Sequence, residues 1–126
     1  MAPLRTIMVV EDDGLLRWSL QHALGDAGWR VIAAPDPCTA LGALPESLDL
    51  LILGLKRRDH DGRILLRTLH RRSPDCRVIV TTPLLREDEC EARKLGACRV
   101  IKKPIDLNRM AGQVRDLLRR DPIDVR

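Results

Sequence analysis

Aromatic side chains are almost missing from this sequence: its 126 residues include two Trp and neither Tyr nor Phe. Because 44% of the residues are hydrophobic, the core must be built from aliphatic side chains, and there is enough apolar material for one. Non-specific binding of single-stranded nucleic acid relies on aromatic faces that stack on bases. The composition therefore excludes that class of protein and predicts a globular domain with an aliphatic core.

Other common signals are missing too. The four cysteines form no CxxC pair and fit no zinc pattern, so we expect small, mostly buried side chains in a reducing cytoplasm. No apolar run is long enough for a transmembrane helix, and the first residues lack the apolar stretch of a signal peptide. The sequence predicts a cytoplasmic protein that does not enter a membrane.

The sequence also lacks a glycine-rich loop of the kind that cradles phosphate. The first apolar run is followed by the acidic turn "EDDG", residues 11–14, which would repel a phosphate group. This argues against a flavodoxin-like protein that binds a flavin, and we expect no required cofactor.

Positive charge is what the sequence has in excess, with a formal net charge of +4. Residues 56–72 alone contain seven Lys or Arg and two Asp. Such a run is usually the solvated side of a helix, but it also fits a docking face for an acidic partner or nucleic acid. The candidate residues of this face are Arg57, Arg58, Arg63, Arg67 and Arg71. No known DNA-binding module is present, so we do not expect sequence-specific DNA binding.

Apolar runs of strand type alternate strictly with segments of helical periodicity. Strands are expected over residues 6–10, 29–34, 48–53, 76–82 and 98–104, and helices over 15–28, 37–44, 62–73, 85–96 and 106–120. This order predicts a single α/β domain with a five-stranded parallel sheet and helices on both faces, a three-layer sandwich. We expect the domain core at about 4–120, with 121–126 a tail or the start of a linker.

Polar side chains follow the strands at the edge where such sheets bind ligands. Glu11 and Asp12 follow the first strand, Thr82 ends the fourth and Lys103 follows the fifth. Paired carboxylates suit Mg²⁺, and a hydroxyl and an ammonium suit the oxygens of a phosphoryl group. The third strand exit would supply a central carboxylate, but the residue there is Gly54.

These motifs resemble the receiver domain of bacterial two-component response regulators, a CheY-like, flavodoxin-like (βα)5 fold. The resemblance is carried by "MVVEDDGLLRW", "VIVTTP" and "GACRVIKKPID". It places Glu11 and Asp12 at the metal-binding pair, Thr82 at the switch hydroxyl and Lys103 at the phosphoryl-contacting lysine. It also implies a cis bond before Pro104. The helix "LLRWSLQHAL" is similar to receivers of sigma-54-dependent activators.

The departures from the family pattern fall on functional positions. Gly54 stands where receivers carry the aspartate that accepts the phosphoryl group, and Pro83 replaces a small residue. Val100 replaces the aromatic residue that reports the switch state, and Arg58 lies near the usual loop proline. We therefore expect at most weak Mg²⁺ binding by Glu11 and Asp12, and a structural ion pair of Lys103 with one of them.

The resemblance implies a non-enzymatic pseudo-receiver that signals through protein contacts. Its expected partner is a histidine kinase, an output domain or another regulator. A homodimer through the face of helix 85–96, strand 98–104 and helix 106–120 is also implied, with Glu87, Glu91, Arg99 and Arg115 on that face. Two alternatives stay open. The chain is the regulatory part of a larger DNA-binding activator, or it is a conventional receiver in which Gly54 is engineered or another acceptor is used.

Overall fold

The protein is described by a computed structural model that covers residues 4–56 and 60–119. Strands and helices alternate along the chain, as predicted. The strands are β1 (Thr6–Val10), β2 (Arg30–Ala34), β3 (Leu50–Gly54), β4 (Arg77–Thr82) and β5 (Arg99–Lys102). The helices are α1 (Gly14–Asp26), α2 (Pro37–Gly42), α3 (His60–Arg72), α4 (Leu85–Lys94) and α5 (Leu107–Arg119).

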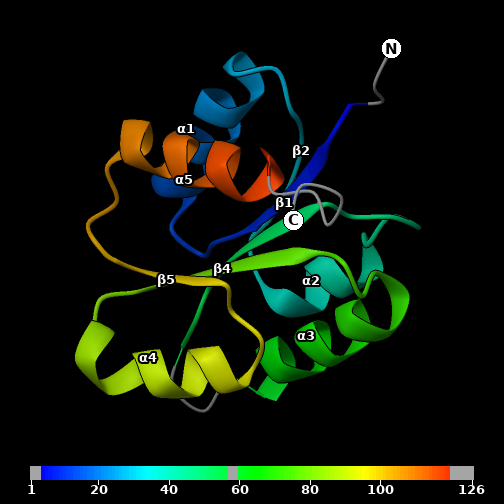
Figure 1. The fold of residues 1–126 in the computed structure, drawn as a ribbon, viewed down its shortest axis with the longest axis vertical. Helices are drawn as coiled ribbons and strands as arrows, with labels where there is room; N and C mark the ends of the chain where they lie inside the picture. The colour runs from blue at the N-terminus through cyan, green and yellow to red at the C-terminus, as the bar shows by residue number, and fades with distance from the viewer. Residues whose placement is uncertain (1–3, 57–59, 120–126) are drawn as a thin grey trace, which may run out of the picture.

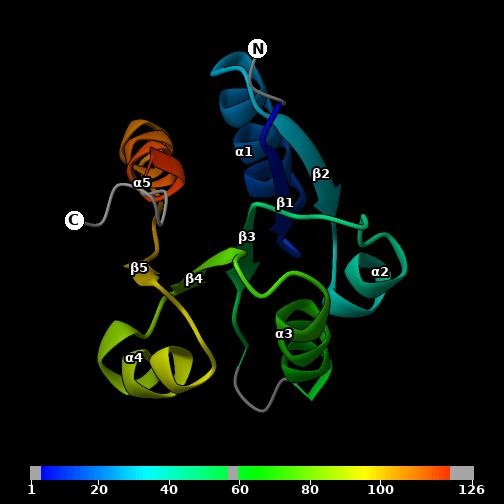
Figure 2. The same ribbon diagram turned by 45° about the vertical axis from the view of Figure 1, so that its right-hand side comes forward.

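The five strands form one parallel sheet in the order β2-β1-β3-β4-β5. Helices α1 and α5 cover one face, and α2, α3 and α4 cover the other (Figures 1 and 2). The chain leaves β1 toward β2 and returns to β3 on the other side, so the topological switch lies between β1 and β3. Ligands of open α/β sheets bind at the carboxyl ends of such strands, which here end next to Glu11 and Gly54.

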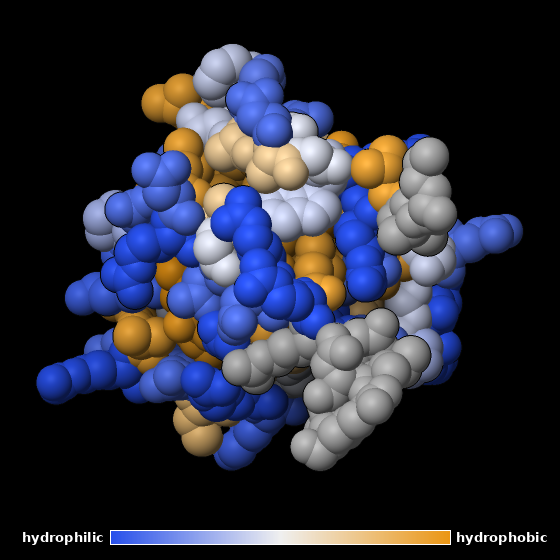
Figure 3. Space-filling view, turned by 45° about the horizontal axis from the view of Figure 1, so that its top comes forward, coloured by the Kyte–Doolittle hydropathy of each residue, from blue (hydrophilic) through white to orange (hydrophobic). Residues whose placement is uncertain are grey.

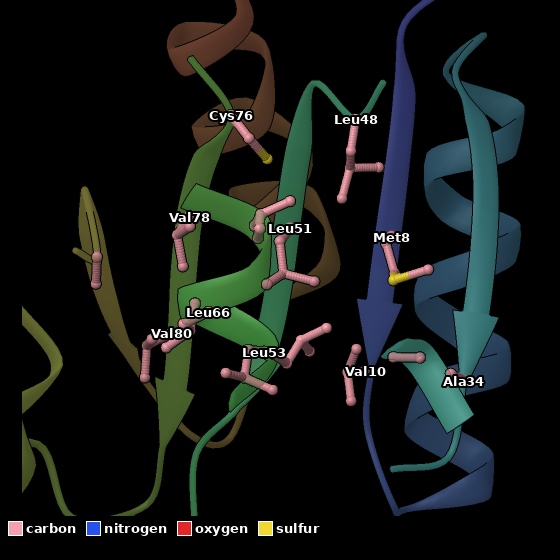
Figure 4. Close-up of a cluster of buried hydrophobic side chains, with 14 of the residues drawn as sticks. Met8, Val10, Ala34, Leu48, Leu51, Leu53, Leu66, Cys76, Val78 and Val80 are labelled. Atoms are coloured by element: carbon pink, nitrogen blue, oxygen red, sulfur yellow. The ribbon is translucent and has the colours of Figure 1, made fainter. Parts of the chain in front are cut away.

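Two aliphatic clusters form the core, one on each face of the sheet. Because side chains alternate along a strand, Met8 and Val10 point to the α2–α3–α4 face, while Ile7 and Val9 point to the α1–α5 face. Figure 4 shows the first cluster, in which Leu66 of α3 packs against β3 and β4. This arrangement confirms the predicted three-layer sandwich.

Capping side chains and glycines mark several helix ends. Asp36 accepts a hydrogen bond from the Thr39 amide at the start of α2, and Asp106 accepts bonds from the amides of Asn108 and Arg109 in α5. Gly28 and Gly96, which follow α1 and α4, both have φ near +103°, a conformation that favours glycine. The Lys103–Pro104 bond is cis, as the resemblance implied.

Some details of the sequence-based prediction were wrong. Only Cys76 is buried, whereas Cys38, Cys90 and Cys98 are exposed because they lie at element ends or on outer helix faces. On α3, Leu65, Leu66 and Leu69 point inward, whereas Ile64 is half-buried. No helix in the part of the chain described here is long and apolar enough to cross a membrane.

Candidate functional site

Gly54 is the last residue of β3 and lies at the centre of the sheet edge. In the strand register it pairs with Thr81 of β4. A Cβ atom at position 54 would lie 3.0 Å from Oε1 of Glu11 and 3.5 Å from the carbonyl oxygen of Val10. The Glu11 carboxylate therefore occupies space next to the backbone of residue 54 that an aspartate side chain would need.

Glu11 is buried at this edge and is held by several polar contacts. Its Oε1 accepts a hydrogen bond from Lys103 Nζ at 2.8 Å, and its Oε2 accepts one from the Asp13 amide at 3.0 Å. Its backbone carbonyl accepts a bond from the Arg17 guanidinium at 2.8 Å. Only 2% of the Glu11 side chain is exposed, against 26% for Lys103. The expected ion pair of Lys103 is present, and its partner is Glu11 rather than Asp12.

Asp12 points outward and pairs with Lys56, whose Nζ lies 2.6 Å from Asp12 Oδ2. This ammonium group is the main reason why the pKa of Asp12 is lowered from 3.8 to about 2. Asp13, the third acidic residue of the turn, caps α1 by accepting bonds from the amides of Leu15 and Leu16. Each carboxylate of "EDD" thus has a different structural partner.

Thr82 is fully buried, and its hydroxyl forms hydrogen bonds at the start of α4. It donates to Asp88 Oδ2 at 2.6 Å and accepts from the Leu84 amide at 3.0 Å. The neighbouring Thr81 is also buried, but its hydroxyl has no hydrogen-bond partner among the described residues. The Thr82 hydroxyl is therefore hydrogen-bonded at the start of α4, whereas that of Thr81, one residue earlier, has no partner among the described residues.

A cavity of about 280 Å³ lies above Gly54. Its charged lining consists of two carboxylates and two ammonium groups, namely Asp12, Asp88, Lys56 and Lys103. Within residues 4–56 and 60–119, no three His, Cys, Asp or Glu side chains come together as a metal site would require. Glu11 and Asp12, the expected metal-binding pair, each lie next to a lysine ammonium group.

The residues expected to form partner faces are placed as follows. Arg63, Arg67 and Arg71 share the exposed side of α3, and Arg63 pairs with Glu91 of α4. Arg57 and Arg58 lie outside the described residues.

On the α4–β5–α5 face, Arg99 is bound to Asp116 at 2.7 Å. Arg115 was expected on this face, but its guanidinium lies 5.8 Å from the centre of the Trp29 ring, which precedes β2 at the opposite edge of the sheet, so the expectation for Arg115 was wrong. Val100 is half-buried and lines a cavity of about 290 Å³ between Leu85 and Met110.

The sequence predicted that Glu11, Asp12, Thr82 and Lys103 lie together at one edge of the sheet, with Gly54 among them. It missed Lys56 as the partner of Asp12, although a lysine two residues after a central strand exit was a usable signal. It also missed Asp88, because nothing in the local pattern shows that a carboxylate in the first turns of α4 turns back to Thr82.

The fold and this edge define a class: a (βα)5 domain with an acidic pair, a threonine and a lysine at the strand ends. The family model of the response regulator receiver domain matches residues 7–115. The chain belongs to the response regulator receiver family.

Curated relatives are consistent with this assignment. The virulence transcriptional regulatory protein PhoP of Salmonella typhimurium is 35% identical over 119 residues, which cover 91% of this chain and 52% of PhoP. The transcriptional regulatory protein CpxR of Escherichia coli K12 is 30% identical over 114 residues, which cover 90% of this chain and 49% of CpxR. The chain thus spans about half the length of these relatives.

Solved structures agree on the fold. A response regulator from Thermotoga maritima has a TM-score of 0.81 at 24% identity, and the match covers 94% of this chain and all of that one. The non-phosphorylated HemR receiver domain of Leptospira biflexa also has a TM-score of 0.81 at 24% identity, with 93% and 96% of the two chains covered.

Proposed function

We propose that this receiver domain signals through protein–protein contacts and is not phosphorylated at the usual acceptor position. The observation that carries the proposal is the placement of the Glu11 carboxylate beside Gly54, where it pairs with Lys103. A glycine offers no nucleophile for phosphoryl transfer. The lysine that would stabilise an incoming phosphoryl group already neutralises a buried carboxylate.

Two further contacts support a domain held in one conformation. The Thr82 hydroxyl is hydrogen-bonded to Asp88 and to the Leu84 amide. It would have to give up these partners to contact a phosphoryl group. Asp12 is bound to Lys56, so a cation would have to displace an ammonium group to reach it. The proposed function therefore requires no cofactor, and Mg²⁺ would bind weakly at most. The proposal includes a cytoplasmic location. There the domain would meet its partner, which is a kinase, an output domain or another regulator.

The test is phosphoryl uptake from a small-molecule donor such as acetyl phosphate in the presence of Mg²⁺. Intact mass spectrometry should detect no adduct on this chain, while a receiver domain that carries the acceptor aspartate serves as the reagent control. A stoichiometric adduct would contradict the proposal, and peptide mapping would then show whether Glu11, Asp12 or another residue is the acceptor.

A second candidate function is favoured by the relatives. PhoP and CpxR are named as transcriptional regulatory proteins, and this chain matches about half of each. On this reading the chain is the regulatory part of a larger transcription regulator, and an output domain is its partner. The reading frame beyond codon 126 decides this: a DNA-binding module there supports it, and a stop codon contradicts it.

Contacts within the chain make a homodimer through the α4–β5–α5 face less favourable. Glu91 and Arg99 are engaged in ion pairs within the chain, and Arg115 lies over Trp29. An intermolecular pair would have to replace one of these contacts, and exchanging one exposed ion pair for another gains little free energy. Sedimentation equilibrium of the isolated domain tests this, with a monomer expected.

A further inference from the structure

The outer side of α3 carries a row of arginines. Arg63, Arg67 and Arg71 are all exposed and follow one another at every fourth position. On an α-helix this spacing places them on one face about 6 Å apart, so that the row is about 12 Å long. We call these three residues the arginine row. Figure 2 shows that α3 lies between α2 and α4, with one side turned away from the sheet.

Most of the charge of this row is not neutralised by the rest of the described chain. Arg63 is bound to Glu91 of α4. Arg67 and Arg71 form no ion pair or hydrogen bond with side chains in residues 4–56 and 60–119. Asp61 is the one carboxylate on α3, and it lies about 120° around the helix axis from Arg67. Two arginines are therefore available to an external carboxylate.

An apolar side chain lies beside the row. Ile64 is half-buried, follows Arg63 directly, and lies one turn before Arg67 on the same side of the helix. It is not among the hydrophobic side chains that pack against either core cluster. Interfaces commonly combine a buried apolar contact with arginines around it. The most exposed large apolar residues lie elsewhere, on α1 and near the chain start, and the face in Figure 3 shows hydrophobic areas that are small and separated.

The surroundings of the row favour a protein over a nucleic acid. Beyond Arg63, α4 exposes Glu87 and Glu91. A duplex carries about one charge per 1.7 Å and extends in both directions, so its phosphates would meet these carboxylates. A short acidic helix can end before them. Carboxylates at every fourth position of such a helix would match the spacing of the arginines.

We propose that the arginine row and Ile64 form the docking surface for an acidic amphipathic helix of a partner protein. Carboxylates of that helix pair with Arg67 and Arg71, and an aliphatic side chain between them covers Ile64. The proposal rests on the signalling role proposed above, because it names the class of partner.

The test uses two synthetic helical peptides labelled for fluorescence anisotropy. One carries glutamates at every fourth position with a leucine between them, and the other has glutamine in place of each glutamate. At about 0.05 M salt, where exposed charges are weakly screened, the acidic peptide should bind at least about tenfold more tightly. The Arg67→Glu/Arg71→Glu variant should lose about tenfold in affinity for it.

The matched control is Arg30→Glu/Arg109→Glu, which changes the net charge equally at two exposed arginines outside α3. Its affinity should stay within about twofold of the wild type if the site is specific. Equal binding of the two peptides, or equal losses in the two variants, would overturn the proposal. Tighter binding of a short DNA duplex than of the acidic peptide, lost in the Arg67→Glu/Arg71→Glu variant alone, would overturn it in favour of nucleic acid.

Circular dichroism melting of both variants shows whether each is folded, and Ile64→Ser supplies a variant without charge change. That variant should weaken binding of the acidic peptide, and an unchanged affinity would contradict the role of Ile64. The measurement uses no phosphodonor. A phosphoryl adduct would therefore contradict the proposed function without altering the result obtained here.

Discussion

The carboxylate of Glu11 lies next to Gly54 and forms an ion pair of 2.8 Å with the ammonium group of Lys103. The two residues come from opposite ends of the sequence and meet because β1 and β5 both end at this edge of the sheet. The pair compensates a buried negative charge, and it uses the lysine that a phosphoryl group would otherwise need.

Lys103→Met should be clearly destabilising, because it leaves Glu11 charged and buried without its partner. We expect a loss of roughly 3 kcal/mol in the free energy of unfolding. Glu11→Gln should cost less, since Lys103 is 26% exposed and can turn to solvent. Urea unfolding of both single variants and the double variant gives the coupling energy. A coupling of zero would show that the pair contributes nothing.

Replacing Gly54 with aspartate should lower the melting temperature in the absence of Mg²⁺. The Cβ atom of the new side chain would lie 3.0 Å from Glu11 Oε1, so its carboxylate would lie next to that of Glu11, and neighbouring like charges repel. Gly54→Asn has nearly the same size without the charge, so the difference between the two variants isolates repulsion. We expect the aspartate variant to melt several degrees below the asparagine variant, corresponding to about 1–2 kcal/mol. An aspartate variant that melts higher than the wild type would be inconsistent with this account.

Adjacent threonines should respond in opposite directions to the same substitution. Thr82→Val removes two hydrogen bonds at the start of α4 and should cost roughly 1–3 kcal/mol. Thr81→Val replaces a buried hydroxyl without a partner in the described residues, and should stabilise by up to about 1 kcal/mol. Chemical denaturation measures both, and hydrogen exchange at the first amides of α4 should change in the Thr82 variant alone. Equal effects in the two variants would contradict the assigned contacts.

The ion pair of Asp12 with Lys56 should be lost in acid. The pKa of Asp12 is lowered from 3.8 to about 2, so the contribution of the pair is complete above pH 4. It should decline as the pH falls below about 4 and disappear only below pH 2, because protonated Asp12 no longer attracts Lys56. Both side chains are more than half exposed, so we expect less than about 1 kcal/mol. Wild type and Lys56→Met should thus differ in urea unfolding near pH 6, and the difference should shrink as the pH falls through 2.

Much of the fold could be predicted from the sequence because its signals are local. Alternating apolar runs located all five strands, and Asp36 and Asp106 marked the starts of two helices. Ligands of open α/β sheets bind at the carboxyl ends of the strands. This rule predicted one site from the residues at those ends, namely Glu11, Asp12, Gly54, Thr82 and Lys103.

The sequence could not predict which partner each polar group would take. The choice of Lys103 between Glu11 and Asp12 depends on the direction in which each carboxylate leaves the turn. The bond from Thr82 to Asp88 depends on how α4 is placed against β4. Such details follow from tertiary packing rather than from local pattern, and so does the exposure of Cys90 and Cys98.

The most direct test of the central claim is the amide NMR spectrum of the wild-type domain titrated with Mg²⁺ and then with beryllium fluoride, a phosphoryl-like anion. If the Glu11–Lys103 pair replaces the acceptor site, signals of Gly54, Thr82 and Lys103 should stay in place throughout. Saturable shifts at these residues that spread into α4 would show a working phosphoryl site and contradict the account.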